Sequence, residues 1–79
     1  MKAKSISRTE YKALIKALVK ARQEANISQK ELANAMGWSQ SEISKYEHFV
    51  RRLDVVEFVD VCKAIGIDSD KLIKEAYKS

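Results

Sequence analysis

The chain has 79 residues, of which 46% are hydrophobic and 33% are charged, and its formal net charge is +4. This length allows one small hydrophobic core and excludes a second module that would sense a ligand or cleave a substrate. The sequence contains no proline, two glycines, one cysteine and no alternating apolar and polar segments, so one all-α domain without an internal disulfide is predicted.

The amino-terminal residues 1–7 include Lys2 and Lys4 and are expected to form a flexible basic arm. Residues 8–79 then make up a single folded domain. Two interpretations of the arm stay open. It either contacts a nucleic acid or is an unstructured tail.

Helix starts are marked by a recurring pattern: an apolar residue precedes Ser or Asp, and Glu followed by another apolar residue comes three positions later. This is the signature of a capping box with a hydrophobic staple. It occurs at 6–11, 27–32, 38–43 and 53–58, and a fifth start at 67–72 has Lys71 in place of Glu. Asn26, Gly37 and Gly66 can adopt the left-handed conformation that ends a helix. The predicted helices span 8–25, 29–36, 40–47, 55–65 and 69–77.

In the first predicted helix, the apolar residues form one stripe, and Arg22 lies in the middle of it. The stripe consists of Tyr11, Leu14, Ile15, Leu18 and Ala25. A buried charge needs a partner of opposite sign, and Glu47 lies on the packed side of the third helix, so an Arg22–Glu47 ion pair is predicted. The alternative is that Arg22 extends along its aliphatic stem to water.

The second and third predicted helices are joined at Gly37, which adopts a positive φ without steric cost. Apolar groups for the inside of the corner come from Leu32, Met36, Trp38, Ile43 and Tyr46. This arrangement over residues 28–47 indicates a helix-turn-helix, a unit that places its second helix in the major groove of DNA. The chain is therefore predicted to bind double-stranded DNA.

The third predicted helix has two different faces. With 100° per residue, Ser41, Ser44, Lys45 and His48 fall between about 100° and 200° from Ile43, the centre of the packed face. One face is therefore expected to pack, and the other to read DNA.

The segment after the third predicted helix has more apolar residues than one inward helix face accommodates. The helix over 55–65 has an inward stripe of Val55, Phe58, Val59, Cys62 and Ile65, which leaves Val56 about 100° outside it. Phe49 either fills a gap in the core or stands out with Val50 and Val56 as an apolar patch for a second subunit.

Charge is distributed unevenly along the chain. Residues 1–52 hold eleven Lys and Arg against five Asp and Glu, whereas residues 53–79 hold four against six. A polyanion is expected to contact the first part, although solvated helix faces produce the same bias.

The segment from Gln29 through Ala33, Gly37 and Ile43 to Tyr46-Glu47 resembles the Cro/lambda-repressor-like, or XRE-type, helix-turn-helix regulators, and the likeness extends over residues 9–74. It implies a compact five-helix DNA-binding domain whose second helix crosses the DNA backbone while the third enters the major groove. The family often pairs an Arg of the first helix with the Glu that ends the third. One departure is Phe49, because the family usually has Gly there.

The resemblance also implies roles for individual residues. The residues expected to read bases are Gln40, Ser41, Ser44 and Lys45, and those expected to bind phosphates are Gln29, Lys30, Arg51 and Arg52. An amide such as Gln40 offers a donor and an acceptor to the N6 and N7 atoms of adenine.

Together these features predict a sequence-specific transcriptional regulator, a repressor that binds an inverted repeat as a homodimer. An antitoxin or restriction-modification controller acting on its own operon, or a helical protein-binding module without DNA binding, is the alternative. No enzyme activity, cofactor, metal site or small-molecule ligand is expected, because the single His and Cys lack orienting partners. With no membrane span or signal peptide, a cytoplasmic location is predicted.

Overall fold

The computed structural model describes residues 8–78, which form five helices. These are α1 (Thr9–Glu24), α2 (Gln29–Met36), α3 (Gln40–Glu47), α4 (Val55–Ile65) and α5 (Ser69–Lys78). Each end lies within one residue of its predicted position, and the all-α prediction is confirmed. The predicted basic arm, residues 1–7, lies outside the described residues.

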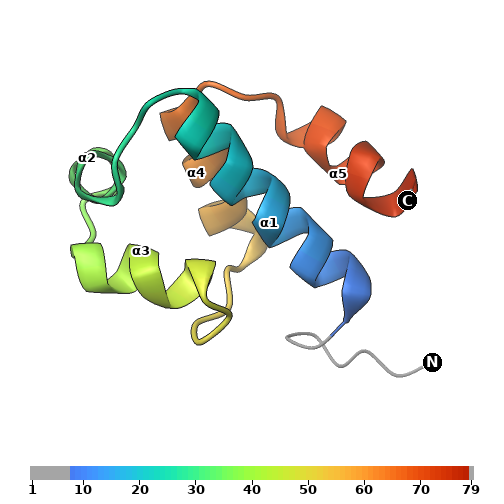
Figure 1. Ribbon diagram of the computed structural model, residues 1–79, viewed down its shortest axis with the longest axis horizontal. Helices are drawn as coiled ribbons and strands as arrows, with labels where there is room; N and C mark the ends of the chain where they lie inside the picture. Colours follow the sequence, from blue (N-terminus) through green and yellow to red (C-terminus); the bar gives the residue numbers. More distant parts are fainter. Residues whose placement is uncertain (1–7, 79) are drawn as a thin grey trace.

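Helix α1 crosses the middle of the molecule in front of α4, with α2 and α3 on one side of the view and α5 on the other (Figure 1). It packs against α5 on one side and against α3 and α4 elsewhere, while α2 packs against α3 and α4. The backbone of α3 approaches α1 and α2 but neither α4 nor α5. Helix α3 therefore lies at an edge of the domain, with its remaining surface uncovered by the described part of the chain.

Three of the four predicted capping boxes are present. The hydroxyls of Ser28 and Ser39 and the carboxylate of Asp54 accept backbone N–H bonds at 3.0, 3.2 and 2.8 Å. In each box the Glu three residues later accepts a bond from the backbone N–H of the cap residue. Helix α1 differs. It begins after Arg8, whose guanidinium binds the carboxylate of Glu10 instead, and the predicted cap residue at position 7 lies outside the described residues.

The corner between α2 and α3 is made by Gly37 at φ 71°. This left-handed residue lets the Trp38 N–H donate to the Ala33 carbonyl at 2.9 Å, which closes the end of α2. The chain then turns at once into the Ser39 cap of α3. Local hydrogen bonding thus sets where one helix ends and the next begins.

The core joins all five helices. Its fully buried side chains are Tyr46, Ile15, Leu18, Leu32, Ile43, Val61 and Cys62. Burial raises the pKa of the Cys62 thiol to about 11, so this cysteine stays protonated at neutral pH.

Two residues assigned to inward stripes are exposed. Ala25 lies just past the end of α1, and Val55, the first residue of α4, is 79% exposed. The inward face of α4 is instead rotated toward Val61, which is fully buried. The periodicity of apolar residues in α4 fits both faces, and only packing on α1 and α2 selects one.

Tyr46 provides a test of core packing, because its buried hydroxyl has no hydrogen-bond partner among the described residues. Burial also raises its pKa well above the usual range. Since an unsatisfied buried polar group costs about 1–3 kcal/mol, Tyr46→Phe should raise the free energy of unfolding by about 1 kcal/mol and the Tm by roughly 4–8 °C.

Tyr11→Phe is the matched control for this substitution. The Tyr11 hydroxyl accepts a bond from the Leu53 N–H at 3.1 Å, so its loss should lower stability. Urea and thermal unfolding measure both variants. A loss of stability in Tyr46→Phe as large as that in Tyr11→Phe would show that the Tyr46 hydroxyl has a partner, such as a buried water.

Candidate nucleic-acid interface

The two faces of α3 differ as the sequence indicates. Ile43 and Tyr46 have no exposed surface. Ser41 and Lys45 on the opposite side are exposed, and so is Gln40 at the start of the helix. Ser44 lies beside them and is half-buried. The four side chains expected to read bases therefore share the uncovered part of the helix.

The carboxyl end of α3 is held by a buried ion pair between Arg22 and Glu47. The Arg22 Nε donates to Glu47 Oε2 at 2.7 Å, and Nη2 donates to Oε1 at 3.2 Å. A third donor of Arg22, Nη1, binds the Ile27 carbonyl at 2.7 Å. The two side chains are only 10% and 5% exposed. Arg22 thus ties α1, the turn before α2, and α3 together.

Gln29 joins the same network, which sequence reasoning did not foresee. Its side-chain Nε2 donates to Glu47 Oε1 at 2.9 Å, so the first residue of α2 is bonded to the last residue of α3. The amide keeps a second N–H, which leaves the predicted phosphate contact chemically available. Lys30 follows it in the chain and is exposed.

Arg51, which the sequence predicts to bind a phosphate, has a carboxylate partner within the domain. Its Nη2 donates to Glu57 Oε2 at 2.8 Å, and its guanidinium lies 4.4 Å from the centre of the Trp38 ring. The hydrogen bond with Glu57 raises the pKa of Arg51, and the same bond lowers the pKa of Glu57. Arg51 therefore connects the corner of the helix-turn-helix to the start of α4, and a carboxylate already balances its charge.

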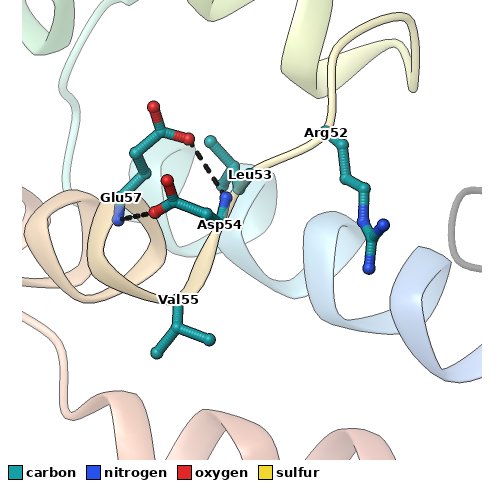
Figure 2. Close-up of a pocket in the computed structure, with 5 residues that line it drawn as sticks. All are labelled: Arg52, Leu53, Asp54, Val55 and Glu57. Atoms are coloured by element: carbon teal, nitrogen blue, oxygen red, sulfur yellow. Dashed lines mark hydrogen bonds between the residues drawn. The ribbon is translucent and has the colours of Figure 1, made fainter.

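Arg52, by contrast, is exposed and makes no ion pair with the described residues. Figure 2 shows its side chain extending away from the Asp54–Glu57 capping box, along one side of an open depression of about 480 Å³. That capping box already occupies the N–H groups of Asp54 and Glu57, so these two donors are not available to an anion. Of the two arginines, Arg52 is the one without an ion-pair partner among the described residues.

These different surroundings predict different effects of alanine at the two positions. Arg52→Ala should weaken DNA binding equally on all sequences and reduce the slope of log affinity against log salt by about one unit. Arg51→Ala should instead lower the free energy of unfolding by about 1 kcal/mol, because the contact with Trp38 and the half-exposed ion pair are lost. Salt titrations of DNA affinity and urea unfolding separate the two. An unchanged stability with a reduced salt slope in Arg51→Ala would contradict this assignment.

Phe49 packs against the core, which is the first of the two alternatives that the sequence left open for it. Its half-buried ring packs against the core, and the Lys12 ammonium lies 5.7 Å from the ring centre. The backbone at Phe49 has φ 63°, the left-handed conformation for which the family usually has Gly. Val50 and Val56 remain as the exposed members of the predicted patch, at 72% and 68%.

Other kinds of site find little support in the described residues. Across 8–78 no three or more His, Cys, Asp or Glu side chains gather as metal ligands. None of the helices there combines the length and apolar character that a membrane span requires.

The fold and the uncovered polar face of α3 define a helix-turn-helix protein, and comparisons with known proteins agree. A helix-turn-helix family model, HTH_3, matches residues 18–72. The structure of an XRE-family like protein from Pseudomonas syringae pv. tomato str. DC3000 is similar, with 46% identity, a TM-score of 0.84, and coverage of 87% of this chain and 84% of that chain. No curated protein matches the chain. The chain belongs to the XRE-type helix-turn-helix family, whose members are DNA-binding regulators.

Proposed function

We propose that this protein is a sequence-specific transcriptional regulator that inserts α3 into the major groove. The observation that carries the proposal is the outer face of α3. Its polar side chains Gln40, Ser41, Ser44 and Lys45 are uncovered, while the opposite face is buried and the helix end is bonded to Arg22. A recognition helix needs this combination, because base contacts require a rigidly placed helix.

Phosphate contacts from the flanks of α3 would set its position in the groove. Gln29 and Lys30 begin α2, and Arg52 follows the turn after α3, so the three groups lie in the segments before and after the reading helix. Such contacts fix register without carrying sequence information. The excess of basic residues in 1–52 favours the same side of the domain.

A second copy of the chain is the proposed partner. A single short helix covers few base pairs, and a two-fold dimer places two recognition helices about 34–36 Å apart in successive major grooves. The exposed side chains of Val50 and Val56 support a contact between copies near the end of α3, whereas the Phe49 ring packs against the core. The preferred site is then an inverted repeat with half-sites roughly 10 base pairs apart.

Repression is the proposed outcome, because occupying an operator is by itself enough to block transcription from it. Control of its own operon, as an antitoxin or a restriction-modification controller does, would use the same surface. The operator sequence separates these contexts once it is known.

Selection of bound sites from random DNA tests the proposal. We expect one enriched motif with two-fold symmetry, and sedimentation should show two chains on each site. Affinity for that motif should fall steeply with salt, since phosphate contacts release counterions. Failure to enrich any motif, together with salt-independent capture of a protein, would favour a helical protein-binding module instead.

A further inference from the structure

His48 ends the recognition helix and lies folded against its last turn. It is the C-cap residue of α3 and is exposed. Its ring Nδ1 lies 2.8 Å from the Ser44 carbonyl oxygen and 3.4 Å from the Ser44 hydroxyl. Because a carbonyl oxygen only accepts, Nδ1 must carry the hydrogen of this bond.

This bond determines what the other ring nitrogen can do. With Nδ1 as donor, Nε2 of the neutral ring has only a lone pair, and it becomes a donor when the ring takes up a proton. Ser44 belongs to the outer face of α3, and His48 falls on that face by its angle around the helix. The ring is therefore held beside Ser44, one of the four side chains proposed to read bases, and its protonation decides whether Nε2 donates to a phosphate or presents a lone pair to it.

Carboxylates near the recognition helix are already occupied. Glu42 and Glu31 accept the backbone bonds of their capping boxes, and Glu47 binds Arg22 and Gln29. None of them is bonded to His48, whose described polar contacts are both to Ser44. No described carboxylate therefore competes with a DNA phosphate for the His48 ring.

Several cations also belong to this part of the chain. Lys45 precedes His48 by three residues on the same helix, and Lys12 of α1 lies over the ring of the next residue. Beyond the turn, Glu57 balances the charge of Arg51, and Arg52 is unpaired by the described residues. A DNA phosphate near this end of α3 would be attracted by these cations. The negative end of the helix dipole also favours a cation there.

We infer that His48 is a phosphate contact that takes up a proton when the protein binds DNA, so that affinity rises as the pH falls. This inference rests on the proposed insertion of α3 into the major groove. It adds to that proposal a contact that responds to pH in the physiological range.

The wild-type protein allows a direct test, because His48 is the only histidine. Its ring signals can be followed by NMR between about pH 5 and about pH 8, in the free protein and on the duplex recovered by selection. The titration midpoint should rise by about one pH unit in the complex, which makes affinity about tenfold higher at the acidic end than at the basic end. Equal midpoints in the free and bound protein would overturn the inference.

Salt dependence and variants give a second readout. The wild-type slope of log affinity against log salt should be steeper by about 0.9 at the acidic end, the value of one extra phosphate contact. His48→Gln should lose this difference, His48→Lys should show the steeper slope at both ends, and Ser44→Ala should keep the pH dependence because its carbonyl remains. Wild-type pH dependence in His48→Gln would assign the proton to another group and overturn the inference.

The failure of this inference is distinct from the failure of the proposed function. Binding to the selected duplex with no pH dependence would refute the role of His48 alone. No binding at any pH would refute the insertion of α3 and the role of His48 with it.

Discussion

Replacing Glu47 by Leu is expected to lower the free energy of unfolding by about 3–5 kcal/mol. The substitution leaves the Arg22 guanidinium buried, with the Ile27 carbonyl as its remaining described partner. A domain of this size is stabilised by only about 0.05–0.15 kcal/mol per residue. The variant should therefore lose about a quarter or more of its stability, as measured by urea unfolding.

A double variant identifies the cause. Arg22→Met combined with Glu47→Leu removes both charges and replaces them with apolar groups of similar size, which is often close to neutral. We expect it to recover most of the lost stability, although the Gln29 amide then loses its acceptor. If the double variant is as unstable as the sum of the two single variants, the cost arises from packing and the ion-pair explanation is wrong.

The exposed ion pair between Arg8 and Glu10 is the matched control. Its side chains are 35% and 37% exposed, so water replaces the partner of either charge. Glu10→Gln should leave the free energy of unfolding nearly unchanged, and the contrast with Glu47 measures the effect of burial.

The second large effect is expected at the base-reading surface. Gln40→Ala should reduce affinity for the selected site by about 1–3 kcal/mol and relax the preference at one base position. Gln40 is exposed at the first turn of α3, so the fold should be unaffected. Titration of the variant on the selected site and on each single-base variant of that site measures both quantities.

Arg52→Ala serves as the comparison for Gln40→Ala, since a lost phosphate contact weakens binding to every sequence alike. An equal loss of affinity for Gln40→Ala on selected and scrambled duplexes would assign Gln40 to the DNA backbone and refute its role in reading bases.

Much of the fold could be predicted because its signals are local. Each capping box depends on residues three positions apart, and Gly37 ends α2 through its own backbone conformation. These bonds form wherever the segment is helical, so the helix ends follow from short stretches of sequence. The Arg22–Glu47 pair was also predictable, because a charge within an apolar stripe requires a partner and Glu47 lies on the packed side of α3.

The tertiary structure alone decided which groups meet across the loops. The contact of Arg51 with Trp38 and Glu57, the bond from Gln29 to Glu47, and the packing of Phe49 depend on the path of the chain after α3 and on the angles between helices. Periodicity along one helix carries no information about either quantity. Periodicity does determine which residues share one face of a helix, so the sequence indicated the outer face of α3. Only the folded chain paired Arg51 with Glu57 while leaving Arg52 without an ion pair among the described residues, and bonded the ring of His48 to Ser44.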